Sequence, residues 1–257
     1  MKRMGVVLLV IAWALVSVPA TAGDGEGDRP EFLAMSHQVW VQPGQALEYE
    51  QALKDHWSMH EAAGDPWTWE TWEQVTGKGT GSYSIRTAGH TWADFDRENG
   101  VDNDREHVIN ELDPHAKWSQ TTINEWDLEI SRWPEDRETP KMVEITEFHL
   151  KRGSVKDFYN AVKKISEMIG EKEMDYQFAW GWTVSGGTGP MMMLAIPHDS
   201  WADFKDKKPG LWEVAEEVMG RTESGNIRES INDAVEETKN YVVVHRPDLS
   251  YSPAGGE

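Results

Sequence analysis

The four residues Trp92-Ala93-Asp94-Phe95 recur as Trp201-Ala202-Asp203-Phe204, and this repeat decides the fold. The two copies lie 109 residues apart, within the stretches HTWADFD and HDSWADFK. Thr91 and Ser200 precede them, and both residue types cap the first turn of a helix. We therefore expect a short helix at each copy, with its Trp and Phe anchoring it to its own sheet.

The spacing of 109 residues also relates the segments that precede the repeat. Apolar positions match apolar positions over about sixty residues without an insertion. Tyr49 corresponds to Phe158, and Leu53 corresponds to Val162. This match predicts an internal duplication. The predicted organisation is a signal peptide at 1–22, a disordered leader at 23–33, a first repeat at 34–134, a linker at 135–140, a second repeat at 141–248 and a flexible tail at 249–257.

Each copy shows the same order of expected elements, which is strand, helix, two strands joined by a glycine-rich turn, helix and strand. The helix after Gly153 is the clearest, because apolar residues recur along it at the helical period from Val155 to Ile169. The order β-α-β-β-α-β is that of the ferredoxin-like unit. The opening strands are expected at 36–42 and 143–151, and the closing strands at 127–132 and 241–245.

The element order, the doubling and the repeated WADF stretch together resemble the dimeric α/β-barrel superfamily. That group includes antibiotic-biosynthesis-monooxygenase-like and NIPSNAP-like proteins. The resemblance implies an α+β fold in which tandem ferredoxin-like repeats cover each other's bare sheet faces, as an intramolecular pseudo-dimeric α/β barrel. It covers nearly all of the chain after the leader. It is a likeness of architecture, and no catalytic motif of the family can be placed on residues of this sequence.

The N-terminal residues have the layout of a secretory signal. Lys2 and Arg3 precede an apolar run from Val6 to Val18, and Ala20-Thr21-Ala22 supplies small residues for cleavage. The apolar run is shorter than the roughly 20 residues that a membrane-spanning helix needs. We expect a secreted or periplasmic protein without stable membrane association after cleavage.

The composition is acidic, tryptophan-rich and free of cysteine. The formal net charge is −20, so the surface repels nucleic acid, and no nucleic-acid partner is expected. No disulfide framework is available, and stability must come from burial, to which 14 tryptophans contribute large side chains. A small-molecule ligand is the partner that remains, and further homo-oligomerisation stays open.

An alternating row of aromatic residues marks the second strand of the second copy. Such a row faces one side of a sheet, and it can stack on a flat organic ligand in a cavity between the sheets. The alternative is ordinary core packing, because the alternation does not say which face is which. The candidate ligand-binding residues are Tyr176, Phe178, Trp180 and Trp182, with Trp40 and Trp69 from the first copy.

Glu147 and His149 share one face of the strand that opens the second copy. Phe148 and Leu150 take the other face and suit the apolar stripe of the following helix. A histidine beside a carboxylate can act as a general base. The alternative is a hydrogen-bonded polar pair at the rim of the barrel.

His56 and His60 align with Ile165 and Ile169, so the first copy carries imidazoles where the second carries hydrocarbon. The spacing of four residues places both on one helix face, as a two-histidine metal site requires. The sequence shows no third ligand that converges with them. We therefore predict no metal and no cofactor, and the alternative is a pair of buried histidines with hydrogen-bonding partners.

The acidic residues that follow the first WADF copy, from Asp94 through Asp104 to Glu106, surround Gly100. Their spacing does not match an EF-hand calcium loop, which places its glycine at position six. A solvated acidic turn is the interpretation that we prefer.

Two functions fit these patterns. The first is a binding protein that holds a small, flat, apolar or aromatic molecule between the sheets. The alternative is an enzyme that resembles cofactor-independent monooxygenases, in which His149 with Glu147, or His56 with His60, moves protons. The sequence leaves open whether the protein is an enzyme.

Overall fold

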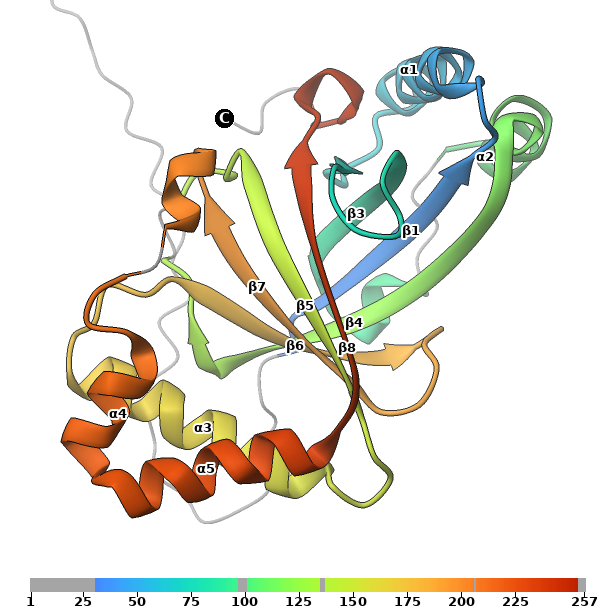
Figure 1. Ribbon diagram of the computed structural model, residues 1–257. Helices are drawn as coiled ribbons and strands as arrows, with labels where there is room; N and C mark the ends of the chain where they lie inside the picture. The colour runs from blue at the N-terminus through green and yellow to red at the C-terminus, as the bar shows by residue number, and fades with distance from the viewer. Residues whose placement is uncertain (1–30, 97–100, 135–136, 206, 254–257) are drawn as a thin grey trace, which may run out of the picture. The chain divides into compact units, whose positions relative to one another are not determined.

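The computed structural model describes residues 31–96, 101–134, 137–205 and 207–253, and Glu31–Glu257 forms one compact unit. The predicted signal peptide lies outside the described residues. In the described chain, eight antiparallel strands close into a barrel in the order β1-β3-β2-β8-β5-β7-β6-β4 (Figure 1). The strands are β1 (Leu33–Val41), β2 (Glu70–Gln74), β3 (Ser82–His90), β4 (Ala116–Arg132), β5 (Met142–Leu150), β6 (Phe178–Ser185), β7 (Met191–His198) and β8 (Val235–His245).

The helices lie outside the barrel, with α1 and α2 on the opposite side from α3, α4 and α5 (Figure 1). The α-helices are α1 (Ala46–Ala63), α2 (Asp104–His107), α3 (Val155–Glu171), α4 (Leu211–Met219) and α5 (Arg221–Ala234). Shorter helical turns are η1 (Trp92–Asp94), η2 (Val108–Leu112), η3 (Asp113–His115), η4 (Trp201–Phe204) and η5 (Pro247–Leu249). The predicted α+β barrel is thus confirmed.

The first half of the chain (34–134) contributes β1 to β4, and the second half (141–248) contributes β5 to β8. Two pairings join the halves: β2 pairs with β8, and β4 pairs with β6. In the second pairing Trp126 lies opposite Gly181, where an added Cβ would come within 3.0 Å of the indole ring. The absence of a side chain at this position therefore lets the two halves approach closely. An origin by duplication stays a prediction.

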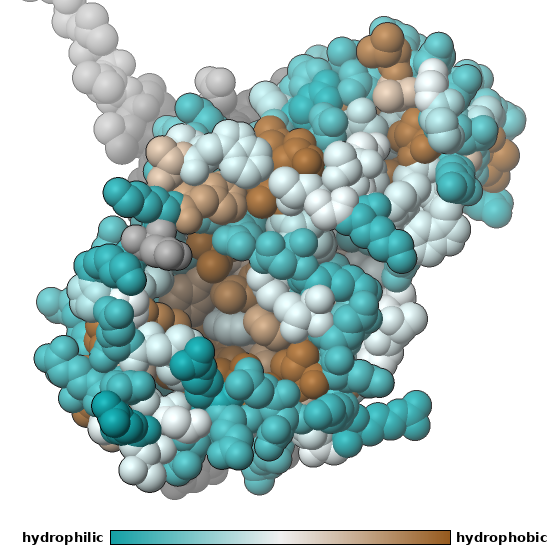
Figure 2. All heavy atoms as spheres, in the orientation of Figure 1, coloured by the Kyte–Doolittle hydropathy of each residue, from teal (hydrophilic) through white to brown (hydrophobic). Residues whose placement is uncertain are grey.

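The predicted apolar stripe of α3 is buried against the sheet. Phe158 is fully buried, and Val162, Ile165 and Ile169 lie in the same cluster as Trp180 of β6. α4 and α5 extend this cover, and Figure 2 shows apolar side chains gathered around a hollow between α4 and β7, on a face otherwise largely hydrophilic. The second half thus has a large apolar core, which is the main source of folding free energy.

The aromatic row of β6 belongs to this core. Trp180 contacts Phe158 of α3, with ring centroids 6.1 Å apart, and Trp182 contacts Tyr159 at 6.3 Å. Phe178 is buried in the same cluster, and Tyr176 packs against it. The expectation that these rings line a cavity between the sheets is therefore wrong, because they point toward α3.

The barrel interior is filled by a separate cluster. Val143 lies on the face of β5 opposite to Phe148, so it points into the barrel, and it packs with Trp72 and Val243. Ala195 completes the buried set. Side chains from both halves therefore meet inside the barrel and stabilise its closure.

The repeated WADF stretches form 3-10 turns in both halves. The Asp94 carboxylate accepts a hydrogen bond from the Thr91 amide at 2.8 Å, and Asp203 does the same for Ser200 at 2.8 Å. The Phe of each copy is the anchor, because Phe204 stacks on His198 with centroids 3.9 Å apart and Phe95 contacts His90 at 5.4 Å. Anchoring by the Trp is wrong, since Trp92 and Trp201 are 46% and 58% exposed.

The chain ends are ordered further than predicted. β1 begins at Leu33, inside the predicted leader. In the predicted tail, Leu249 is fully buried and Tyr251 pairs with Trp69 across an isolated β-bridge. Both side chains are apolar enough to stabilise this segment against α1 and β2. Among the described helices, none has the length and apolar character needed to cross a membrane.

Candidate functional site

A cluster of polar side chains lies buried between α1 and the outer face of the sheet in the first half. His56 and His60 are only 5% and 2% exposed, and they lie one helical turn apart on the inner face of α1. Gly64 ends α1 with φ of 71°, a left-handed conformation that glycine adopts without strain. The chain turns back there, and the Asp65 amide donates to the His60 carbonyl at 3.1 Å.

This turn places Asp65 directly beneath His60. The Asp65 side chain is fully buried, and its Oδ2 lies 2.6 Å from His60 Nδ1. The carboxylate also accepts hydrogen bonds from Trp69 Nε1 at 3.0 Å and from the Trp67 amide at 2.9 Å. A buried carboxylate needs such donors, and here three of them hold it in place.

Asp104 of α2 reaches the same two histidines from the other side. Its Oδ1 lies 3.3 Å from Nε2 of His60 and 3.3 Å from Nε2 of His56. The two imidazole Nε2 atoms are 3.1 Å apart. The prediction of a solvated acidic turn is therefore wrong for Asp104, because its carboxylate contacts both histidines while its side chain stays 38% exposed. The third converging group that the sequence did not reveal comes from this helix.

The pKa values follow from burial and from these carboxylates. Burial and the nearby His60 together lower the pKa of His56 to about 4, although Asp104 acts to raise it. Burial also acts to lower the pKa of His60, but the hydrogen bonds with Asp104 and Asp65 outweigh it, and the pKa is raised. The hydrogen bond with His60 lowers the pKa of Asp104. At neutral pH His56 is thus uncharged beside an ionised Asp104.

A second layer of aromatic groups surrounds the cluster. His107 Nδ1 lies 3.3 Å from His56 Nδ1, and His37 stacks on Trp69 with ring centroids 5.8 Å apart. Trp57 contacts the His60 ring edge-on at 5.1 Å. The sequence predicted only Trp69 among these residues as a ligand-binding side chain. Its position beside the histidines is compatible with that prediction, although its indole is buried and hydrogen-bonded to Asp65.

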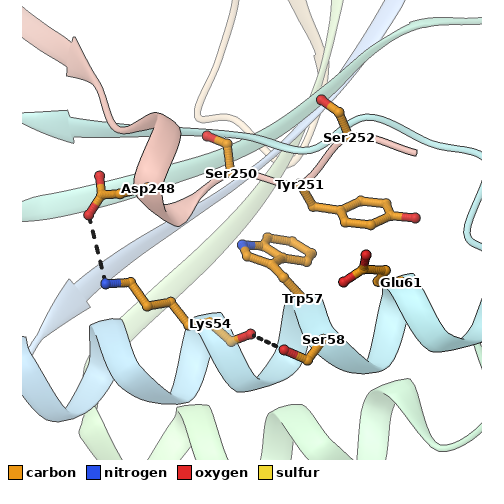
Figure 3. A pocket seen from close by; sticks show the side chains of 8 residues that line it. All are labelled: Lys54, Trp57, Ser58, Glu61, Asp248, Ser250, Tyr251 and Ser252. Atoms are coloured by element: carbon orange, nitrogen blue, oxygen red, sulfur yellow. Dashed lines mark hydrogen bonds and ion pairs between the residues drawn. The ribbon is translucent and has the colours of Figure 1, made fainter. Parts of the chain in front are cut away.

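A surface pocket of about 270 Å³ opens beside Trp57 (Figure 3). Trp57 and Tyr251 form its floor, and their ring centroids lie 5.1 and 6.0 Å from that of His60. The remaining lining side chains are polar: Lys54, Ser58, Glu61, Asp248, Ser250 and Ser252. The pocket therefore reaches within one aromatic layer of the cluster.

The second predicted pair, His149 and Glu147, lies on β5 in the other half of the chain. His149 Nε2 is 3.4 Å from Glu147 Oε2 and 3.0 Å from Lys239 Nζ. The Tyr241 hydroxyl donates to Glu147 Oε1 at 2.9 Å. His149 also lines an open pocket of about 450 Å³. This arrangement matches the polar pair at the barrel rim, and both nitrogen and carboxylate are engaged by neighbours on β8.

The remaining predicted residue, Trp40, packs against Trp118 at a tilted angle, with ring centroids 4.4 Å apart. Trp118 is 52% exposed, so this pair lies near the surface. The structure thus brings together His56, His60 and Trp69 of the predicted residues. It leaves Trp40, the β6 row and the His149–Glu147 pair elsewhere.

The cluster under α1 offers two kinds of chemistry. The His60–Asp65 pair can hold a proton and orient the imidazole, as a carboxylate does for a general base. The Nε2 atoms of His56 and His60 with Asp104 Oδ1 form a group whose donor atoms all lie within 4.8 Å of one another, close enough to share a cation. Of these four side chains Asp104 is the most exposed, at 38%.

Comparison with solved structures supports the barrel fold. The anthrone oxidase-like protein matches with a TM-score of 0.56 and 11% identity, covering 90% of this chain and 95% of that one. A candidate monooxygenase from Fusobacterium nucleatum subsp. nucleatum matches with a TM-score of 0.56 and 9% identity over 88% of this chain and 96% of that one. Another candidate monooxygenase, from Lactobacillus acidophilus NCFM, matches with a TM-score of 0.52 and 8% identity, covering 86% of this chain and 96% of that one.

No protein-family model and no curated protein sequence matches this chain. At such low identity the structural matches show the fold alone. The resemblance to the dimeric α/β-barrel superfamily is therefore confirmed as a likeness of fold. The likeness to NIPSNAP-like proteins and the tandem origin stay predictions.

Proposed function

We propose that this chain is an enzyme that oxidises a small organic molecule, with the histidine cluster under α1 as its reacting centre. The observation that carries the proposal is the buried convergence of His56, His60, Asp65 and Asp104. Buried titratable groups destabilise a fold, and in proteins they cluster at active sites. At the matching positions of the second half, Ile165 and Ile169 pack as hydrocarbon.

The class of reaction is suggested by the neighbours in fold. They include candidate monooxygenases and an anthrone oxidase-like protein, all of which share the barrel. Fold alone does not fix chemistry, so the cluster carries the argument and the neighbours supply the substrates to try first. Trp57 contacts both the cluster and the surface pocket, and with Tyr251 it offers an aromatic floor to a flat substrate.

The competing function, binding of a flat ligand by the β6 aromatic row, has less support. Phe178 and Trp180 are buried against α3, and they offer no open face to a ligand. We therefore place the reacting centre in the first half only.

The test is oxygen uptake by the purified chain with a panel of anthrones and hydroxylated aromatic compounds. Product mass spectra would report insertion of oxygen. We expect turnover that falls at least 100-fold in His60→Ala and in Asp65→Asn, and that persists in His149→Ala. If His149→Ala abolished turnover while the α1 variants retained it, the reacting centre would lie on β5, and the proposal would be wrong.

We further propose that the chain is exported, on the basis of the basic, apolar and small-residue order of residues 1–22. Fractionation of cells that express the full chain tests this. Mature protein in the periplasm or medium, with its N-terminus near Gly23, is expected. Full-length protein confined to the cytoplasm would refute it.

A further inference from the structure

We propose that His56, His60 and Asp104 hold a single divalent transition-metal ion. Their three donor atoms form a nearly equilateral triangle with edges of 3.1, 3.3 and 3.3 Å. The two nitrogens come from consecutive turns of α1, and the oxygen comes from α2, so two separate elements converge on one point. Two imidazoles and one carboxylate are the ligand set of many catalytic metal sites.

The size of the triangle fits a metal ion. Ligand bonds to first-row metals are about 2.1 Å, so an ion equidistant from the three atoms would lie about 1 Å above their plane. The angles between ligands at the ion would be about 100°, between the values of octahedral and tetrahedral coordination. All three ligands would occupy one face of the ion, which leaves the opposite positions open for water or substrate.

The donor types narrow the choice of ion. Calcium and magnesium prefer oxygen ligands, and neither is well served by two imidazole nitrogens. Two histidines with one carboxylate suit iron(II), zinc, cobalt(II) and related ions. We therefore infer that the ion is a transition metal and not an alkaline-earth metal.

The hydrogen bonds at Nδ1 of the two histidines leave their Nε2 lone pairs free to face the proposed ion. Asp65 is an acceptor for His60 Nδ1, so a neutral His60 donates its proton there and turns its Nε2 lone pair toward Asp104. A carboxylate that holds the outer nitrogen of a metal-bound histidine is the usual second layer of such sites. His107 Nδ1 is placed to accept from His56 Nδ1 in the same way.

Without an ion, a proton on His60 Nε2 can be donated to Asp104 Oδ1 or to His56 Nε2, so the three atoms share hydrogen bonds. A divalent cation would take the place of that proton and contact all three atoms at once.

This inference does not rest on the proposed function, because metal binding is measured without substrate. If both hold, the ion supplies Lewis-acid or redox chemistry beside the aromatic wall, and the enzyme is not cofactor-independent. Our prediction of no metal from the sequence would then be replaced.

The experiment uses the full chain after removal of metals with a chelator. Cobalt(II) is added, and its visible absorption reports both stoichiometry and coordination; zinc is titrated by calorimetry. Both titrations contain millimolar magnesium to occupy the acidic surface. We expect one ion per chain, a loss of affinity of at least about 100-fold in His60→Ala and Asp104→Asn, and about 10–100-fold in Asp65→Asn.

Two further variants guard against misfolding and against binding elsewhere. The triple exchange His56→Ile, His60→Ile, Asp65→Met introduces the side chains of the second half, and it is expected to fold and to bind no cobalt at the site. His115→Ala removes a part-buried histidine bonded to Gln45 and should bind as the unaltered chain does. Absence of stoichiometric binding in the unaltered chain, or undiminished binding in the folded triple variant, would overturn the proposal.

Discussion

α1 and α3 occupy matching places in the two halves of the molecule, but their buried faces differ in chemistry. The helices begin at Ala46 and Val155, 109 residues apart, and each covers the outer face of its own strands. α3 buries isoleucines and a phenylalanine, whereas α1 buries His56 and His60. The backbone is the same in plan, so the difference lies in the side chains.

The difference extends to the turn that follows each helix. Asp65 donates its amide to the carbonyl of His60 at 3.1 Å, and Met174 donates its amide to that of Ile169 at 3.0 Å. These turns are equivalent, yet one carries a carboxylate and the other a thioether. The polar residues of the first half thus occur as a set, because an imidazole buried without a partner would destabilise the fold.

The elements that pack around α1 and α3 differ as well. α4 and α5 extend the apolar core of the second half, whereas η5 and Tyr251 close over α1 and β2 in the first. Both halves therefore bury an apolar cluster under their helices, and the first half buries polar groups in addition. These apolar clusters help a chain without disulfides to tolerate buried titratable groups.

The largest expected effect is the loss of stability when one polar residue of the cluster is removed, compared with the loss when His56, His60 and Asp65 are all exchanged for the residues of the second half. Asp65→Ala would leave His60 Nδ1, Trp69 Nε1 and the Trp67 amide without their acceptor, and we expect a loss of about 3–5 kcal/mol in unfolding free energy. The triple exchange His56→Ile, His60→Ile, Asp65→Met should cost less, although it alters more residues. Urea unfolding of the metal-free proteins, followed by circular dichroism, measures both.

The order of these two effects is the critical outcome. If the triple exchange were the more destabilising, the first half would not accept the packing of the second, and the two turns would not be equivalent. Tryptophan fluorescence provides an independent signal, because Trp57 and Trp69 border the cluster.

The reverse exchange in α3 should have a smaller effect. Ile169→His places an imidazole beside Met174 in an apolar cluster, and we expect a loss of about 2–4 kcal/mol. Adding Met174→Asp supplies the acceptor that His60 has in the first half, so the pair should be more stable than the sum of the single effects by about 1 kcal/mol or more. Denaturant unfolding of the two single variants and the double variant gives this coupling energy. Simple additivity would contradict the equivalence of the turns.

Much of the fold could be predicted from the sequence because its signals are local or periodic. The 109-residue spacing of WADF aligned the elements of both halves, and the helical stripe of α3 identified its buried face. The alignment also drew attention to His56 and His60, since imidazoles stood where isoleucines were expected. The order of elements and this pair therefore followed from pattern, and the barrel followed from the resemblance to the dimeric α/β-barrel superfamily.

The rest of the site could not be predicted, for two physical reasons. Asp104 meets His60 across 44 residues, and only the tertiary fold brings them together. In the acidic stretch around it, nothing in the sequence distinguishes Asp104, whose carboxylate turns toward the histidines, from its acidic neighbours. For the β6 row, alternation shows that the rings share a face, but not that this face points to α3.

The smallest expected effect concerns the segment that closes the first half. Arg246 donates to Glu50 Oε1 at 2.9 Å and to Glu73 Oε2 at 2.7 Å, and its hydrogen bonds lower the pKa of Glu50 and of Asp248. Carboxylates with a lowered pKa in the folded state contribute stability above their unfolded pKa of about 4, and this stability is lost as the pH falls through the folded value.

Arg246→Met should therefore reduce the unfolding free energy at pH 7 by on the order of 1 kcal/mol and flatten its decline between about pH 5 and pH 3. Lys163→Met, which removes the more exposed ion pair between Lys163 of α3 and Glu129 of β4, is the matched control and should change little. Equal effects of the two variants would show that the first half gains nothing special from its C-terminal closure.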